Sequence, residues 1–368
     1  NNVMDLLNWA ANDYPQLEAI KYKHKSSSEW KTVNYLEYSD NVKRFSKCLR
    51  SQLPSNDNPK VAIIGFNSPE WFYAHLGTMS AGGISVGMYP TSDPATCEHI
   101  IKESHVNVLV IEDTKQLEKF MNIDIGSVKL IIHYGNVLRK SIEQMGNKVK
   151  IIKYLDFIRS PIDETLHKIK VKQQDIATII YTSGTTGKPK GAIIKHSNIT
   201  DILNNMLLTI HTKANMDLCV GERLISYLPL NHIAAQVMDI YIPIASLSTV
   251  YIAQPDAMKG SLAQTIKEVR PTIFIGVPRV WEKIMEKLNE KLTMGTDMAS
   301  IISGIILQTM GLDKCKFAIT AAAPITTETR TFFSKFGLHL CDVYGMSETT
   351  GPISLTMPGV SKIGSAGI

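Results

Sequence analysis

The chain has 368 residues, of which 44% are hydrophobic and 20% are charged, an ordinary globular composition. Such a length is sufficient to bury more than one apolar core. The net charge is +5, and the basic residues are spread along the chain. This charge is too small and too dispersed to indicate nucleic acid as a partner. The same charge permits a weak peripheral contact with anionic membranes, although the basic residues are more simply explained as part of a solvated surface.

The cysteines and the apolar runs indicate in which cell compartment the chain is expected. The five cysteines are scattered and lack C-x-x-C spacing, which is typical of a reduced chain without a zinc site. No signal-peptide pattern opens the sequence, and the longest uncharged runs, 240–255 and 298–312, are shorter than the roughly 20 residues of a spanning helix. We therefore expect core elements in both runs and a cytoplasmic location, with peripheral attachment to the endoplasmic reticulum or other membranes left open.

The first half of the chain alternates between helical and strand patterns. Residues 1–15 and 38–49 place apolar side chains on one helical face. Ser68 before Pro69 can cap a helix, and Asp93-Pro94 opens another that runs to residue 103. The expected strands are 19–22, 29–35, 60–65, 83–88, 107–111, 128–133 and 149–154. The repeated strand–helix–strand order from residue 60 onward predicts a parallel sheet covered on both faces.

A polar stretch, 160–174, is expected to connect a first lobe, about 1–165, to a second lobe, about 175–355. The expected strands of the second lobe are 223–228, 250–252, 272–276, 316–320 and 338–342, and its expected helices are 198–210, a charged helix ending at 291, and 326–336. The predicted fold class is therefore α/β, with two lobes of mainly parallel sheet flanked by helices.

The most informative segment is 181–191, with the sequence Tyr-Thr-Ser-Gly-Thr-Thr-Gly-Lys-Pro-Lys-Gly, between expected strands 175–180 and 192–194. Glycines let backbone N–H groups approach an anion, hydroxyls donate to its oxygens, and lysines supply charge, so the loop can wrap a phosphate. It is not a Walker A loop, because only two residues separate Gly184 from Gly187 and a proline follows Lys188. An ordinary hairpin loop is the alternative.

A second cluster, 344–351, follows the expected strand 338–342, at the kind of strand end where open α/β sheets bind ligands. Glu348 can coordinate Mg²⁺, which takes one or two carboxylates plus phosphate oxygens. Tyr344 offers a flat face to a base, and Ser347 can donate to a phosphate. Considered alone, the segment is also compatible with an exposed turn.

Two further segments are candidates for ligand contacts. The small residues of Thr-Ala-Ala-Ala-Pro at 320–324 would let an adenine ring lie flat against the backbone, and a closely packed turn is the alternative. In the segment 227–236, His232 follows a strand and precedes the small apolar residues 233–235, which would suit the wall of an acyl tunnel. A lone histidine is also often structural.

The segment 181–191 resembles the phosphate-binding signature of the adenylate-forming (ANL) superfamily, which includes acyl-CoA synthetases, peptide-synthetase adenylation domains and luciferases. With the strings at 228–236, 276–284 and 344–349, the chain looks like the long- and very-long-chain acyl-CoA synthetases of the bubblegum group, from about Trp30 to its end. The resemblance implies the large N-terminal AMP-binding domain of such an enzyme, with 356–368 as the start of the following β subdomain.

The resemblance also implies chemistry. A long-chain fatty acid and ATP, with Mg²⁺, would give acyl-AMP and pyrophosphate, and coenzyme A as co-substrate would then give the thioester. The implied catalytic residues are Thr182, Lys188, His232 and Glu348, of which Glu348 also holds the metal. The residues implied to bind the nucleotide are Thr182, Ser183, Gly184, Thr185, Thr186, Gly187, Lys188, Pro189, Lys190, Ala321, Ala322, Ala323, Asp342, Tyr344, Gly345, Met346, Ser347, Glu348 and Thr349.

The chain departs from this family pattern in several ways. Gln236 stands where some long-chain relatives place a gating tryptophan, Ser347 replaces a more usual threonine, and the connection 283–315 is shorter than in such relatives. Relatives continue beyond residue 368 with a ribose-binding aspartate segment, a hinge and a small C-terminal domain that carries a catalytic lysine. We therefore expect residues 1–368 to bind ATP without completing a turnover.

Two alternatives remain at this point. One is a nucleotide-binding module without activity, and the other is adenylation of a different carboxylic acid. An amino-acid substrate is disfavoured, because the segment around His232 lacks an aspartate that could pair with an ammonium group. Neither the preferred chain length nor the oligomeric state follows from the sequence.

Overall fold

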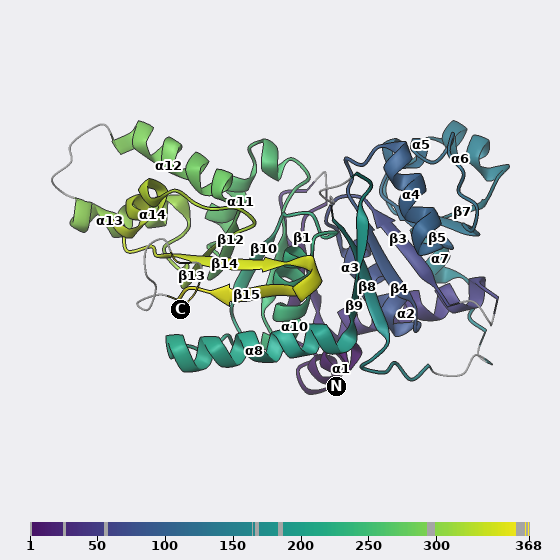
Figure 1. Cartoon of the computed structure of the whole chain (residues 1–368), viewed down its shortest axis with the longest axis horizontal. Coiled ribbons are helices and arrows are strands. Elements are labelled where there is room, and N and C mark those ends of the chain that lie inside the picture. Colours follow the sequence, from purple (N-terminus) through teal and green to yellow (C-terminus); the bar gives the residue numbers. More distant parts are fainter. Residues whose placement is uncertain are drawn as a thin grey trace. The chain divides into compact units, whose positions relative to one another are not determined.

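The computed structural model of the protein contains two compact units (Figure 1). Unit 1 comprises Asn1–Ile20, Thr32–Thr200 and Leu228–Gln236, and unit 2 comprises Lys21–Lys31, Asp201–Tyr227 and Val237–Ile368. The structure describes residues 1–368 except 1, 25–26, 55–57, 164, 166–168, 183–186, 293–298, 358–364, 366 and 368, and it does not describe the side chains of 291–303.

Unit 1 is built on a seven-stranded sheet of order β7-β6-β5-β3-β4-β8-β9, in which only the β8–β9 pair is antiparallel. Its strands are β3 (Lys60–Ile64), β4 (Ile84–Met88), β5 (Val108–Ile111), β6 (Leu130–His133), β7 (Lys150–Lys153), β8 (Ile176–Thr182) and β9 (Lys190–Lys195). Its helices are α1 (Val3–Asp13), α2 (Tyr35–Gln52), α3 (Pro69–Ser80), α4 (Pro94–Ser104), α5 (Thr114–Glu118), α6 (Arg139–Gly146), α7 (Tyr154–Arg159) and α9 (Ile233–Gln236).

Helices cover both faces of this sheet, which explains why its central strands are apolar throughout. Helix α3 lies on β3 and β4, and α1 and α2 pack with it. On the other face, Ala62 and Ile64 of β3 share a buried cluster with Ile101 of α4 and Phe120. The expected parallel, doubly covered sheet is confirmed.

The predicted helix starts in unit 1 are confirmed as well. The Ser68 hydroxyl accepts a hydrogen bond from the backbone N–H of Trp71 at 3.2 Å, and Pro69 occupies the first turn of α3. The Asp93 carboxylate accepts from the backbone N–H of Thr96 at 2.7 Å at the start of α4. Each side chain thus satisfies a donor that the first helical turn leaves unpaired.

Unit 2 contains the sheet β12-β13-β14-β15, parallel except for β15, and takes part in a second sheet of order β10-β11-β1-β2. Its elements are β10 (Arg223–Ser226), the π-helix Val237–Tyr241, α10 (Ile242–Ser246), β11 (Thr249–Ile252), α11 (Leu262–Val269), β12 (Ile273–Gly276), α12 (Pro278–Leu292), α13 (Ala299–Met310), β13 (Phe317–Ala321), α14 (Thr327–Ser334), β14 (Leu340–Met346) and β15 (Gly351–Leu355). The chain passes from one unit to the other within β1 (Glu18–Tyr22), β2 (Lys31–Asn34) and α8 (His196–Ala214).

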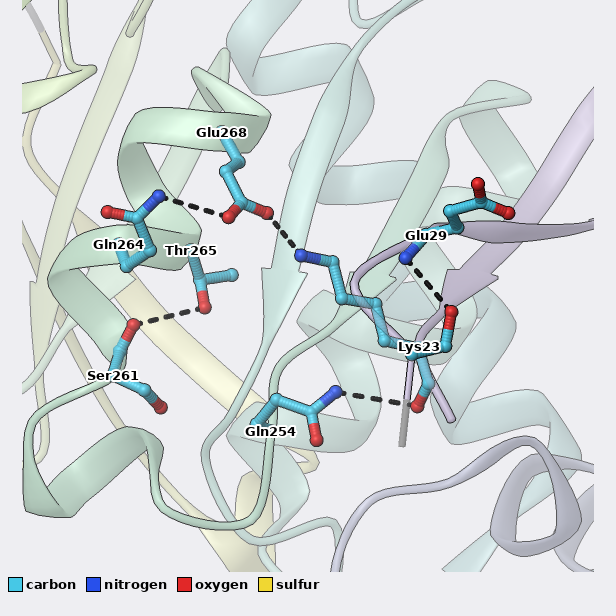
Figure 2. Close-up of polar contacts among 8 residues, drawn as sticks. Lys23, Glu29, Gln254, Ser261, Gln264, Thr265 and Glu268 are labelled. Atoms are coloured by element: carbon cyan, nitrogen blue, oxygen red, sulfur yellow. Dashed lines mark hydrogen bonds and ion pairs between the residues drawn. The ribbon is translucent and has the colours of Figure 1, made fainter. Parts of the chain in front are cut away.

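Polar contacts of Lys23 connect the segment Lys21–Lys31 to other parts of unit 2 (Figure 2). Lys23 reaches Glu268 of α11, with its Nζ 2.5 Å from the carboxylate, and its backbone carbonyl accepts from the Gln254 amide at 3.4 Å. Its ammonium also lies 4.8 Å from the centre of the Trp30 ring. One lysine therefore joins three separate stretches of sequence.

The division into units differs from the two expected lobes. Strands β8 and β9 belong to the sheet of unit 1, because Val86 and Gly87 of β4 pair in parallel with Ile179 and Ile180 of β8. The stretch 160–174 consequently lies inside unit 1 and is not a connection between two lobes. In the described part of the chain, no helix combines the length and the apolar character needed to cross a bilayer.

Candidate functional site

The predicted phosphate loop joins two hydrogen-bonded strands. Strands β8 and β9 form an antiparallel hairpin whose last pairs are Tyr181 with Gly191 and Thr182 with Lys190. A Cβ atom at residue 191 would lie 2.7 Å from Ile179 and 3.2 Å from the Tyr181 ring, so this position requires glycine. The two expected strands on either side of the loop are confirmed, whereas Ser183, Gly184, Thr185 and Thr186 lie outside the described residues.

Helix α4 anchors both sides of this hairpin. The His99 Nε2 atom lies 2.9 Å from the backbone carbonyl of Pro189, and the Ser104 hydroxyl lies 2.7 Å from the Tyr181 hydroxyl. Burial raises the pKa of Tyr181, so its hydroxyl keeps its proton for this contact. Gly187 has a φ of 126°, a conformation that favours glycine, and the Lys188 and Lys190 side chains are exposed. The anchored hairpin thus carries two exposed lysine side chains.

His232 lies in a loop held against the same sheet. The Asn67 amide, which follows β3, donates to the backbone carbonyl of Leu228 at 2.9 Å. At Gly87 of β4, an added Cβ atom would lie 2.6 Å from the Cα atom of Asn231. Because β3, β4 and β8 are parallel, the His232 loop and the phosphate hairpin both occupy the carboxyl edge of the sheet, where α/β proteins bind ligands.

The hydrogen bonds of this loop define the state of His232. Its Nδ1 atom accepts from the backbone N–H of Ala234 at 3.3 Å, and burial lowers its pKa. The neutral ring therefore carries its proton on Nε2, where it can donate to an acceptor. Gln236 is fully buried and its amide donates to the backbone carbonyl of Leu230 at 2.9 Å. That contact connects the last residue of α9 to the segment that precedes His232.

Unit 2 brings together the other predicted nucleotide contacts. Ala321 of β13 pairs in parallel with Val343 of β14, so the segments 321–323 and 344–349 leave the sheet at adjacent strand ends. Ala322 adopts a φ of 74°, which is costly for a residue with a Cβ atom and typical of functional turns. Contrary to expectation, β14 continues through Tyr344 to Met346, because these residues pair with β15. Tyr344 is 52% exposed and can therefore stack a base.

The turn after β14 presents Glu348 to solvent. The Thr349 hydroxyl donates to the backbone carbonyl of Gly351 at 2.8 Å, and the backbone N–H of Met346 donates to the Thr349 hydroxyl at 3.3 Å. Ser347 is buried, whereas Glu348 is exposed. Among the described residues, no group of three or more metal-ligating side chains exists. A single free carboxylate nevertheless fits Mg²⁺, which relies mainly on phosphate and water oxygens.

Asp342 has a partner that the sequence did not reveal. Its carboxylate is paired with Arg330 of α14, and its backbone N–H donates to the Thr356 hydroxyl at 2.6 Å. Arg330, like His99 and Ser104 in unit 1, carries no local signature, because each acts on a strand distant in the sequence. Their positions depend on the sheet order and could not be predicted from spacing.

The fold and these segments define an α/β protein with an antiparallel hairpin at the carboxyl edge of a mainly parallel sheet. The chain belongs to the AMP-binding enzyme family, because the model of that family matches residues 7–368. It is 35% identical to the long-chain-fatty-acid–CoA ligases ACSBG2 of Gallus gallus, over 93% of this chain and 49% of that protein, and of Xenopus laevis, over 93% and 51%. The chain therefore spans about half the length of these relatives.

Solved structures show the same fold. The A-PCP didomain of carboxylic acid reductase from Segniliparus rugosus, determined in complex with AMP, superimposes with a TM-score of 0.81 at 20% identity, over 96% of this chain and 54% of that one. The predicted architecture of an adenylation domain is thereby confirmed.

Proposed function

We propose that this chain is the nucleotide- and acid-binding part of an AMP-forming ligase that activates a long-chain fatty acid, first as acyl-AMP and then as the coenzyme A thioester. The observation that carries the proposal is the apolar His232 loop beside the phosphate hairpin, in a chain of the AMP-binding family. The two relatives are long-chain-fatty-acid–CoA ligases, which supports the same acid and the same thiol.

In the first step a carboxylate oxygen of the acid attacks the α-phosphorus of ATP, the α–β phosphoanhydride bond breaks, and pyrophosphate leaves. Within unit 1, the hydroxyls of Thr182, Ser183, Thr185 and Thr186 and the ammonium of Lys188 would bind the outer phosphates and offset their charge. In the second step the thiol of coenzyme A attacks the acyl carbon and releases AMP.

His232 would orient the acid. With Nδ1 occupied by the backbone of Ala234, its Nε2–H group can donate to one carboxylate oxygen and leave the other free to attack. Because burial lowers the pKa of His232, the ring stays neutral near pH 7. It would therefore bind the carboxylate through a hydrogen bond and not through an ion pair. The segment 228–236 contains no acidic residue, which favours an acid without an ammonium group.

Unit 2 would contribute to nucleotide binding. Tyr344 and the segment 321–323 would contact adenine, Ser347 would donate to a phosphate, and Glu348 would hold Mg²⁺. The metal supplies charge neutralisation at the phosphates when it is bound. Asp342 would act through its ion pair with Arg330, which fixes the strand that carries Tyr344.

The substrate can be tested on the complete natural protein with ATP, Mg²⁺ and coenzyme A, by measuring pyrophosphate and thioester with palmitate, acetate and phenylalanine. Each buried methylene contributes about 0.8 kcal/mol, so kcat/KM should be far higher for palmitate than for acetate. Faster turnover of acetate or phenylalanine would contradict the substrate. ATP binding without pyrophosphate release from any acid would instead favour a binding module without activity.

A further inference from the structure

We propose that unit 2 carries a further ligand site, for a lipid with one acyl chain and a phosphate head group, in a groove between α11, α12, the end of α13 and the turn 257–260. The groove has a volume of about 670 Å³, within the range typical of small-molecule sites. Its described lining residues all belong to unit 2 (Figure 1). Binding at this groove would not depend on the ligase activity proposed above.

Helix α12 has one apolar face toward the sheet and a second apolar face toward the groove. Trp281 packs on Phe274 of β12, with the ring centres 5.3 Å apart. Val280, Ile284 and Leu288 recur every four residues on another side of the helix, and all three line the groove. Helix α12 thus carries more apolar surface than its contact with the sheet explains.

Part of the apolar lining is accessible from solvent. Met258 is 49% exposed, Ala263 of α11 is exposed, and Ile284 and Met310 are partly exposed. An acyl chain that covered these side chains would remove apolar surface from water on both partners. Methionine side chains adapt their shape to such a partner. This part of the groove therefore fits the acyl chain.

Basic side chains border the apolar lining. Arg279, Lys283 and Lys287 recur every four residues on α12, and each directly precedes one of its three apolar lining residues. Lys259 and Lys267 line the groove from the turn and from α11. In the described part of the chain, none of these four lysines forms an ion pair. Like charges four residues apart destabilise a helix, and an anion between Lys283 and Lys287 would remove this cost.

The two acidic residues of the lining do not neutralise the lysines. Glu286 lies 3.4 Å from the Arg279 guanidinium, which is also 3.3 Å from Glu282, and Glu290 has an interaction of its own. Lysine binds phosphate as a point charge. A phosphate monoester carries up to about two negative charges, so it offsets more of this excess than a carboxylate would. Charge complementarity therefore favours a phosphate head group.

The test is isothermal titration calorimetry of the complete natural protein with oleoyl lysophosphatidate, kept below the concentration at which micelles form. Lys283→Gln combined with Lys287→Gln should weaken this binding at least tenfold, because each lysine near an anionic lipid contributes about fivefold. The same variant should leave oleate and ATP binding unchanged. Met258→Ser, at an exposed position, should weaken lysophosphatidate binding severalfold. Lys43→Gln combined with Lys47→Gln, two exposed lysines at the same spacing on α2, is the matched control and should have no effect.

Circular dichroism identifies any variant that has lost its fold. Absence of lysophosphatidate binding to the unmodified protein, or equal affinity in the Lys283 and Lys287 double variant, would overturn the proposal. An equal loss of oleate binding in that variant would refute the phosphate head group. Binding to vesicles of phosphatidylcholine and phosphatidate without binding to the monomeric lipid would assign the groove to a membrane surface instead. A dimer in sedimentation equilibrium that Met258→Ser abolishes would assign it to a second copy of the chain.

Discussion

Thr182 and Lys190 face each other across the β8–β9 hairpin and are the last residues to pair before the phosphate loop. Their pairing fixes where the loop leaves the sheet, and the contact between His99 and the backbone of Pro189 fixes its return. A loop with both ends held loses less conformational entropy when it binds an anion. If the loop binds phosphate as proposed, the hairpin would lower the entropic cost of that binding.

Lys188→Ala should weaken ATP binding much more than AMP binding, because the exposed ammonium would contact only the outer phosphates. We expect a loss of at least tenfold for ATP, measured by calorimetry with each nucleotide. Lys195→Ala, which removes an exposed lysine from the other end of β9, is the matched control. Equal losses for ATP and AMP would show that Lys188 does not contact the outer phosphates.

Glu348→Gln should lower acyl-AMP formation by at least about 10²-fold in the complete protein, comparable to the loss of one key electrostatic contact. The amide keeps the size of the side chain but cannot bind Mg²⁺ as strongly as a carboxylate. Pyrophosphate release at several Mg²⁺ concentrations is the measurement, and Glu328→Gln, an exposed acid of α14, is the control. A variant with normal release and normal Mg²⁺ dependence would exclude Glu348 as the ligand.

The sequence was sufficient to predict the elements whose signals are local. The apolar runs of β3 to β6, the caps at Ser68 and Asp93, and the strands on either side of the loop at 181–191 all depend on neighbours in the chain, and each is found as expected. The small residues 321–323 at a strand end were also predicted, although not the left-handed conformation of Ala322.

Features that depend on sheet order could not be predicted. No pattern within β8 indicates that it pairs with β4. The hairpin was therefore expected in the second lobe, whereas it belongs to unit 1. The pairing of β15 with Tyr344 and Met346 likewise extends β14 into a segment that had been interpreted as a turn. His99 and Arg330 act across such pairings, and only the fold reveals them.

Acid should destabilise unit 1 through two buried histidines. Burial lowers the pKa of His75 to about 3 and that of His196 to about 4; the charge of His196 lowers the pKa of His75 further, whereas Asp175 and Asp5 partly offset the effect of burial on His196. Unfolded histidine titrates near 6.5, so below that pH the unfolded chain binds more protons and stability falls until about pH 3. Relative to the intrinsic exchange rate at each pH, hydrogen exchange of residues 69–80 should accelerate as the pH falls over this range, and His75→Gln should reduce the acceleration. His211→Gln, at an exposed position, should leave the acceleration unchanged. Equal acceleration in the two variants would contradict the role of His75 in the acid destabilisation.

Asp239 should make unit 2 less stable as the pH rises, whereas the two histidines make unit 1 less stable as the pH falls. It lies in the π-helix Val237–Tyr241, fully enclosed, and burial raises its pKa to about 8 despite a hydrogen bond from Ser226. Its Oδ2 atom has no partner among the described residues, so the carboxyl is protonated at neutral pH. Its stabilising contribution is complete below the unfolded pKa near 3.8 and is lost as pH rises towards 8.

Asp239→Asn keeps the shape and the acceptor for Ser226 but removes the titration. Between pH 5 and pH 8 the unmodified chain should lose up to about 1.4 kcal/mol per pH unit at this site, and the variant should not. Hydrogen exchange of the segment 237–246 at pH 5, 6.5 and 8 measures the difference locally, with Asp201→Asn as the exposed control. The variant should exchange more slowly than the unmodified chain at pH 8 and about equally at pH 5. If the unmodified chain instead exchanges more slowly than the Asp239→Asn variant at pH 8, then Asp239 is ionised at that pH and has a cationic partner.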